Sequence, residues 1–389
     1  MMASMSPKAQ RSAATLSRYS FLEVDVGDHG VGSLGGGSGS PGSPAASGAP
    51  LPPKTWSAAA REELAGVAAV LILIYAAFAY NVVFLGRVLP SSGKGQYTSC
   101  LAGFFNGCLV LTAWCWLRAH VADAGSIPES WRAFVEAAGD SLCFAPVRRQ
   151  WQPGLTTYCR KCVVLRPERT HHCKACDICV LRMDHHCPFV KNCIGFNNYK
   201  FFLLLLAYGM LLSFLGFATT LPDLVTCVSS MARPHTGTPA QDSSPSNSIT
   251  TREQWFFIGF GLLSLVMSIL LQQMAIVHFW FALRNQTQLE NGYDNMVNPY
   301  DQGTAMGNLS QVLGEFGPDW FVPIAPLRPL SDGVSYRRGD FVSLEESQAD
   351  RYGKLEGEAL WRIRYHVSGR RGSPTGGFGP ETACTSCLQ

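Results

Sequence analysis

Four long stretches without a charged residue set the strongest limit on how this chain can fold. They cover residues 64–85, 97–117, 201–221 and 255–283. A helix that crosses a bilayer needs about 20 apolar residues, because each residue advances it by about 1.5 Å. Polar residues dilute the second stretch, so a buried helix of a soluble core is its alternative. We predict an α-helical polytopic membrane protein with four transmembrane helices.

The charged residues are few, and their positions predict an orientation. They make up 15% of the 389 residues, against roughly 25% in an average soluble domain, and a net charge of +3 gives no reason to expect a nucleic acid partner. Lys and Arg number 5 before the first stretch, 2, 12 and 2 in the three connections, and 10 after the last. The positive-inside rule therefore predicts that both termini and residues 118–200 lie in the cytosol.

Three further features bear on the location of the chain. The N-terminal stretch has no early apolar core, so we expect no cleaved signal peptide. The glycosylation sequons at Asn285 and Asn308 would face the cytosol and remain unmodified. We expect a multi-pass protein of an endomembrane, Golgi or ER, rather than of the plasma membrane.

Composition divides the chain into helical and irregular parts. Residues 30–53 are dominated by Gly, Ser, Ala and Pro, which cannot bury enough apolar surface to fold. The predicted organisation is a disordered cytosolic tail (1–60), a first helix pair (61–118), a cytosolic loop (119–200), a second helix pair (201–284) around an exoplasmic loop (222–254), a membrane-proximal region (285–325) and a flexible cytosolic tail (326–389).

Cysteine and histidine are concentrated in the cytosolic loop. Seven of the 14 cysteines lie between 159 and 193, together with the pairs His171-His172 and His185-His186. A reduced cytosol favours metal binding over disulfides. The motifs 159–162 and 176–179 each place two thiolates within reach of one tetrahedral zinc, although other pairings are possible. Six cysteines and two histidines fill two four-coordinate sites and leave Cys187 over.

The surplus thiol has the surroundings of a nucleophile. Lys and Arg side chains between 160 and 191 should lower the pKa of Cys187 and favour its thiolate. Pro188 favours an extended conformation at Cys187, in which alternate side chains share a face. His185 would then flank the thiol, and His186 would point away and be free to bind metal. Strict alternation places Asp184 with His186, so spacing alone does not give Asp184 a role.

Residues 158–202 closely resemble the DHHC family of protein S-acyltransferases, or palmitoyltransferases. The matching motifs are Cys159-Arg-Lys-Cys162, Pro167-Glu-Arg-Thr-His-His-Cys173, Asp184-His-His-Cys187-Pro188, Asn192-Cys193-Ile-Gly195 and Asn198-Tyr199-Lys-Phe201. The resemblance implies four transmembrane helices with a small two-zinc, cysteine-rich domain, about 156–200, between the second and the third.

The resemblance also implies a role for each residue of the site. One zinc is held by Cys159, Cys162, His172 and Cys179, and the other by Cys173, Cys176, His186 and Cys193. Cys187 is acylated, His185 is its base, and Asp184 polarises His185. Contacts to the phosphates of CoA fall to Arg166, Arg169 and His171, for which a solvated basic face is the alternative.

The implied reaction moves a long-chain acyl group, typically palmitoyl, from acyl-CoA to cysteine thiols of membrane-associated proteins through a Cys187 acyl-enzyme. Both zinc ions would be structural, because a site closed by four protein ligands has no open position for substrate. The acyl chain would lie in an apolar cavity, with Tyr208 and Leu212 as candidate lining residues. The alternative is a catalytically inactive, membrane-anchored zinc scaffold that binds proteins. A channel is disfavoured because the stretches carry no charge.

Four motifs outside the cysteine-rich domain add expectations. The family's Asp-Pro-Gly is Asp123-Ala124-Gly125 here, so this turn lacks its proline. Its Thr-Thr-x-Glu is Thr287-Gln288-Leu289-Glu290, and we expect weaker packing of that segment on the active-site loop. The last turns of the fourth stretch, with Gln272, Gln273 and His278, should extend into water and contribute to a site. Leu309, Val312, Leu313 and Phe316 predict one apolar helix face, on the bilayer or the catalytic loop, with an ordinary packed helix as the alternative.

Overall fold

The computed structural model describes residues 56–142, 144–145, 155–232, 250–293, 298–338, 357–365 and 367. Four helices of this part are long and apolar enough to cross a membrane: Ala60–Ser91, Gly95–Val121, Tyr199–Met231 and Thr251–Leu283. Each contains one predicted stretch and extends beyond it, so the predicted fold class is confirmed. The first is composite, with α2 (Trp56–Phe78), the π-helical η2 (Ala79–Val88) and the short α3 (Leu89–Ser91).

The membrane helices pack around aromatic side chains. After the short η3 (Gly95–Tyr97) comes α4 (Thr98–Val121), and the third and fourth crossings are α6 (Tyr199–Ala232) and α7 (Thr251–Leu283). Tyr80 stacks on Phe105 with ring centroids 3.7 Å apart, which joins the first crossing to the second. Phe84 stacks on Phe257 of the fourth at 5.8 Å. Leucine, valine and phenylalanine side chains remain exposed around the outside, as a lipid-facing surface requires.

The predicted exoplasmic loop, residues 222–254, is partly helical. α6 continues through Pro222 to Ala232, and α7 begins at Thr251 behind a capping box of Thr250 and Glu253. The extension carries the buried Asp223, whose carboxylate accepts hydrogen bonds from Lys94 Nζ at 2.9 Å and from Ser92 Oγ at 2.7 Å. α6 can extend beyond the apolar stretch because Lys94 and Ser92 bind the buried charge of Asp223. Residues 233–249 and 1–55 lie outside the described part, so those predicted loops and tails stay predictions.

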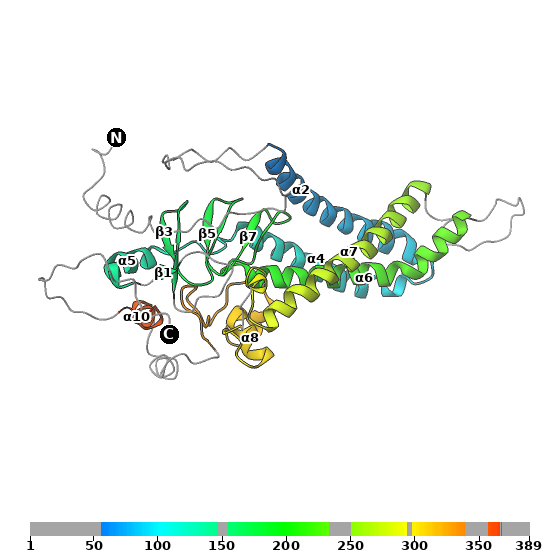
Figure 1. The fold of residues 1–389 in the computed structure, drawn as a ribbon. Helices are drawn as coiled ribbons and strands as arrows, with labels where there is room; N and C mark the ends of the chain where they lie inside the picture. The colour runs from blue at the N-terminus through cyan, green and yellow to red at the C-terminus, as the bar shows by residue number, and fades with distance from the viewer. Residues whose placement is uncertain are drawn as a thin grey trace, which may run out of the picture.

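Small elements gather at one end of the helix bundle, where α4 ends and α6 begins (Figure 1). They are α5 (Glu129–Ala138), η4 (Gly139–Ser141), β1 (Phe144–Ala145), and three hairpins formed by β2 (Thr156–Cys159) with β3 (Val164–Arg166), β4 (His171–Cys173) with β5 (Ile178–Val180), and β6 (His185–Cys187) with β7 (Asn192–Ile194). β1 pairs with β2 in parallel, and each hairpin is antiparallel. The cysteine-rich region is therefore a row of three hairpins at this end of the helix bundle.

The chain after α7 returns to the same end of the bundle. It forms η6 (Glu290–Gly292), α8 (Ala305–Leu313) and η7 (Pro318–Phe321). Leu309 and Val312 of α8 pack with residues of the cluster around Cys187. Phe316 lies past the helix end at Gly314, whose φ is +83°, and is 61% exposed. Leu309 and Val312 therefore pack within the protein, on a cluster that includes Cys187 and Val190 of the cysteine-rich loop, and the predicted common face with Phe316 is wrong.

The predicted flexible tail, residues 326–389, contains folded segments. Residues 326–338 are described, and α10 (Glu358–Arg364) packs on α5, with Trp361 against Trp131 at a centroid distance of 5.6 Å. The Tyr365 hydroxyl donates to Val334 O at 2.8 Å and accepts from the Glu168 N–H at 3.0 Å. This part of the prediction is corrected, because the tail supplies aromatic side chains to the core of the cysteine-rich region.

Candidate active site and metal centres

The three hairpins repeat one pattern every 14 residues. Cys159, Cys173 and Cys187, spaced by 14, each end the first strand of a hairpin, opposite Val164, Ile178 and Asn192. The residue before each second strand has a positive φ: 52° at Val163, 57° at Asp177 and 53° at Lys191. We call the turn from each of these cysteines to the residue three positions later a knuckle. This short repeat was missed in the sequence, although the cysteine spacing contains it.

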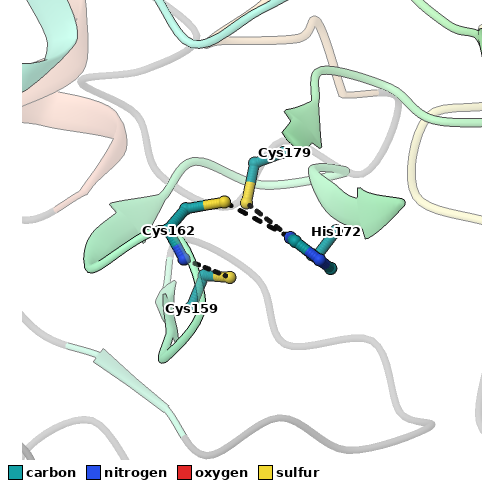
Figure 2. Close-up of side chains that lie close together, drawn as sticks. All are labelled: Cys159, Cys162, His172 and Cys179. Carbon is teal, nitrogen blue, oxygen red and sulfur yellow. Dashed lines mark hydrogen bonds between the residues drawn. The ribbon is translucent and has the colours of Figure 1, made fainter. Parts of the chain in front are cut away.

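The first knuckle and the second hairpin bring four candidate metal ligands together. Cys159 and Cys162 lie at the knuckle, and His172 and Cys179 face each other across β4 and β5. Their ligand atoms lie within 4.8 Å of one another, with Cys162 Sγ 3.3 Å and Cys179 Sγ 4.0 Å from His172 Nδ1 (Figure 2). Ligands of a tetrahedral zinc at about 2.0–2.3 Å lie about 3.3–3.8 Å apart, so these four residues fit the ion.

The second knuckle repeats this arrangement with the third hairpin. Cys173 and Cys176 lie at the knuckle, and His186 and Cys193 face each other across β6 and β7. His186 Nδ1 is 3.4 Å from Cys176 Sγ and 3.7 Å from both other sulfurs. Both groups of four are those that the family resemblance implies. The interleaving has a physical reason, since each knuckle uses the histidine and cysteine of the next hairpin.

The third knuckle has no following hairpin, and its second position is Val190 instead of cysteine. Cys187 is therefore outside both groups of ligands and lies 4% exposed among apolar side chains from the ends of the membrane helices. Burial opposes ionisation of the thiol, but hydrogen bonds from His185 and from the Val190 and Phe189 amides outweigh it, so the pKa of Cys187 is lowered. The third knuckle thus provides amide donors to the sulfur of Cys187. The first knuckle does the same for the candidate ligand Cys159, whose sulfur accepts a hydrogen bond from Cys162 N.

His185 lies between this thiol and Asp184. Its Nδ1 is 2.7 Å from Asp184 Oδ2, so the neighbouring pair meets despite the strict alternation of an extended chain. Burial disfavours the imidazolium, but Asp184 and Cys187 raise the pKa of His185 to about 9. The pKa of Asp184 is lowered, because hydrogen bonds from His185 and the Gln288 amide overcome its burial. These shifts favour a thiolate at Cys187, an imidazolium at His185 and a carboxylate at Asp184, with His185 between the other two.

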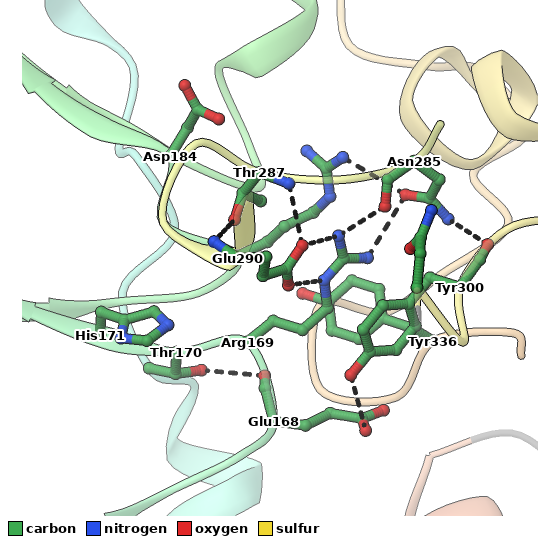
Figure 3. Close-up of polar contacts among 12 residues, drawn as sticks. Glu168, Arg169, Thr170, His171, Asp184, Asn285, Thr287, Glu290, Tyr300 and Tyr336 are labelled. Carbon is green, nitrogen blue, oxygen red and sulfur yellow. Dashed lines mark hydrogen bonds and ion pairs between the residues drawn. The ribbon is translucent and has the colours of Figure 1, made fainter. Parts of the chain in front are cut away.

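The segment after α7 holds the carboxylate from the other side. Gln288 N–H donates to Asp184 Oδ1 at 2.9 Å, while Thr287 and Glu290 bond each other through backbone and side chain. Glu290 is fully enclosed and binds Arg169 of the cysteine-rich region (Figure 3). The segment therefore packs on the active-site loop without the second threonine, and whether that packing is weaker stays a prediction. The contact to Asp184 uses a backbone amide, which glutamine supplies as well as threonine.

The turn at Asp123 also forms without the family's proline. Asp123 Oδ1 accepts hydrogen bonds from the amides of Gly125 and Ser126, both at 3.1 Å. Gly125 has a φ of +122°, and its carbonyl accepts from Leu181 N at 2.7 Å. The turn connects α4 to the strands of the site, and the Asp123 side chain fixes it in place of a proline ring.

The three residues expected at the CoA phosphates have other contacts. Arg169 donates to both oxygens of Glu290, at 2.6 and 2.9 Å, and its guanidinium lies 4.1 Å from the Tyr300 ring centroid. Its charge is enclosed and paired, and its contact to CoA stays a prediction. Arg166 is buried and donates to Thr157 Oγ1, and His171 bonds Tyr293 at 3.1 Å. Burial and the nearby Arg166 lower the pKa of His171 to about 4, so its ring is neutral at pH 7.

Comparison with known proteins agrees with this geometry. A family model described as DHHC palmitoyltransferase matches residues 153–294. Probable protein S-acyltransferase 13 of Arabidopsis thaliana is 30% identical over 286 residues, which cover 72% of this chain and 90% of that protein. Palmitoyltransferase ZDHHC20 of Mus musculus is 29% identical over 301 residues, covering 72% of this chain and 78% of its own. The chain therefore belongs to the DHHC family of palmitoyltransferases.

Proposed function

We propose that this protein S-acyltransferase takes its acyl group from a long-chain acyl-CoA and carries it on Cys187. The observation that supports this most is the third knuckle, where a cysteine outside both ligand groups meets the His185–Asp184 pair. A thiolate is the reactive form of cysteine, and a neighbouring imidazolium stabilises it.

In the first step the Cys187 thiolate attacks the carbonyl carbon of the acyl-CoA thioester. The new carbon–sulfur bond forms as the bond to CoA breaks, and His185 gives its proton to the departing CoA sulfur. In the second step a substrate cysteine gives a proton to His185 while its sulfur attacks the acyl group, and Cys187 leaves as thiolate. Each step exchanges one thioester for another, so positioning and thiolate activation account for most of the acceleration.

The surroundings of Cys187 suit a fatty substrate. The thiol shares a buried cluster with Phe202 and Leu206 of α6 and Ala275 of α7. At about 0.8 kcal/mol per buried methylene, a chain of about fourteen methylenes contributes on the order of 10 kcal/mol before ordering costs. Tyr208, which donates to Phe321 O at 2.6 Å, and the buried Leu212 stay our candidates for residues along the acyl chain.

We assign two structural zinc ions to the groups described above. Bound zinc would cross-link neighbouring hairpins and so fix the register of the third, which carries Cys187. Each imidazole also has a carboxylate near its other nitrogen, Asp177 Oδ1 at 3.4 Å from His172 Nε2 and Glu62 Oε1 at 3.7 Å from His186 Nε2. Such outer carboxylates orient metal-binding histidines.

The test is incubation of the purified chain with labelled palmitoyl-CoA, followed by addition of a protein substrate. We expect hydroxylamine-sensitive label on the wild type, none on Cys187→Ser, and normal labelling of the matched control Cys100→Ser. A zinc content near two in Cys187→Ser would show that its fold is intact. Equal labelling of wild type and Cys187→Ser, or none in either, would instead favour the inactive zinc scaffold.

A further inference from the structure

A second histidine, from a membrane helix, meets the same carboxylate. His278 lies on α7, five residues before its end at Leu283, and its Nδ1 is 3.5 Å from Asp184 Oδ2. Its ring centroid is 5.2 Å from that of His185. Asp184 and the two histidines place one nitrogen or oxygen each within 4.8 Å of one another. Two imidazoles therefore lie close to one buried carboxylate oxygen, which is hydrogen-bonded to His185.

His278 Nδ1 lies within hydrogen-bond distance of this oxygen, but the two atoms form no hydrogen bond in this structure. The residue is 5% exposed, and its Nδ1 makes no hydrogen bond within the part of the chain that the structure describes. The Phe202 ring makes T-shaped contacts with both imidazoles, with centroid distances of 4.8 Å to His278 and 5.1 Å to His185. A buried polar atom without a partner is costly, and catalytic hydrogen bonds that are long in a free enzyme tighten when substrate binds.

The neighbouring polar residues of α7 do not share this position. Gln272 and Gln273 are exposed on the helix surface, so His278 alone among the three lies beside Asp184. Asp184 Oδ1 is occupied by the Gln288 amide. The Oδ2 atom is therefore the point at which α7 can influence the carboxylate and, through it, His185.

We propose that His278 is a positioning residue: in the neutral form with Nδ1 protonated it donates to Asp184 Oδ2 and holds the carboxylate in the orientation that serves His185. The proposal rests on the proposed function, since it assumes that His185 and Cys187 carry out acyl transfer. With this role for His278, the fourth membrane helix, α7, takes part in the catalytic arrangement. It would hold the third hairpin at the end of the helix bundle.

The experiment compares two substitutions of nearly equal shape. His278→Asn keeps an N–H at the position of Nδ1, and His278→Leu removes it. The readout is the single-turnover rate constant of Cys187 acylation by palmitoyl-CoA, with the KM for acyl-CoA measured beside it. We expect His278→Leu to slow acylation about 10-fold with little change in KM, and His278→Asn to regain most of the rate. Gln273→Leu, the same change on the exposed face of α7, should leave the rate unchanged.

A double substitution tests whether His278 acts through Asp184. In an Asp184→Asn background, His278→Leu should have little further effect, because the carboxylate it orients is gone. A full additional 10-fold loss there would overturn the proposal, as would equal rates for His278→Asn and His278→Leu, which would reduce His278 to packing. If His278→Leu loses zinc and does not fold, His278→Gln replaces it. The amide of glutamine lies one bond further from the backbone than that of asparagine, so His278→Gln should acylate Cys187 more slowly than His278→Asn.

Metal analysis tests whether His278 is a metal ligand instead of a positioning residue. Three zinc ions in the wild type and two in His278→Leu would make His278 a metal ligand and overturn the proposal. Two zinc ions in both are expected. Failure of the proposed function is distinguishable, because it would appear as an absence of acyl label on wild-type Cys187, and the positioning role would then fall with it.

Discussion

At the scale of single residues, one valine separates the candidate nucleophile from a metal ligand. Cys159 and Cys173 each have a cysteine three positions later, whereas Cys187 has Val190, which is 1% exposed in the same cluster. A second thiol at this position would complete a third two-cysteine knuckle. The distinction between zinc ligand and reactive thiol therefore lies in the partner residue as much as in Cys187 itself.

We accordingly predict that Val190→Cys lowers self-acylation strongly while both zinc ions remain. The new thiol lies where it can join Cys187 in binding a metal or in a disulfide, and either engagement removes the nucleophile. Activity should return in part after treatment with a reductant and a mild chelator. Val190→Ala is the matched control, because it changes volume and adds no thiol. Full activity of Val190→Cys under oxidising, zinc-replete conditions would contradict this account.

The Arg169–Glu290 pair gives a second prediction at this scale. Both side chains are about 1–2% exposed, and removing one charge of a buried pair typically costs about 3–5 kcal/mol. Glu290→Gln should therefore lower the unfolding temperature clearly and slow acylation, since the Gln288 amide that binds Asp184 is part of the same turn. The control is Glu315→Gln, whose partner Arg328 is 58% exposed and whose loss should cost at most about 1 kcal/mol. Equal losses of unfolding temperature in Glu290→Gln and Glu315→Gln would show that the buried charge of Arg169 does not need Glu290 as its partner.

At the scale of elements, sequence patterns predicted what depends on local spacing. The apolar stretches gave the four crossings, and the cysteine motifs together with the family resemblance gave both ligand groups. The partner of Arg169 could not be predicted from charge pattern, because Glu290 is 121 residues away and two crossings, α6 and α7, lie between them. For the same reason Trp361 was assigned to a flexible tail: its partners on α5 lie more than 200 residues earlier, and no local periodicity indicates them.

α10 provides a prediction at this scale. Trp361 is 5% exposed and packs on Trp131 and Phe134, so Trp361→Ala should destabilise the cysteine-rich region by about 3–5 kcal/mol. Thermal unfolding would detect this loss, and proteolysis should cleave near α10 sooner. Glu358→Ala, an exposed change on the same helix, should have an effect within about 0.5 kcal/mol. Indistinguishable stability of the two variants would mean that α10 contributes little to the core of the region.

At the scale of the whole molecule, the hairpins and the segment after α7 meet at one end of the bundle (Figure 1). Two crossings, α6 and α7, separate the hairpins from the segment after α7, and an even number of crossings returns the chain to the same side of a membrane. We propose that this end faces the cytosol, as the distribution of Lys and Arg predicts. The Golgi or ER remains our proposed location.

An engineered glycosylation sequon tests the orientation. A sequon inserted between residues 238 and 244, in the connection between α6 and α7, should be glycosylated in cells and shift the protein on a gel. The same sequon inserted after residue 375 should remain unmodified. The natural sequons at Asn285 and Asn308 are poor reporters, because both residues are buried. Glycan on the C-terminal insertion alone would reverse the proposed orientation.

The central claim is that Cys187 carries the acyl group, and mass spectrometry of the acylated protein tests it most directly. The wild type is mixed with palmitoyl-CoA, stopped within one turnover, digested and analysed by peptide. We expect a hydroxylamine-labile acyl group on the peptide containing Cys187, absent when His185 is replaced by alanine. An acyl group found first on another cysteine, with Cys187 unmodified or bound to zinc, would contradict it.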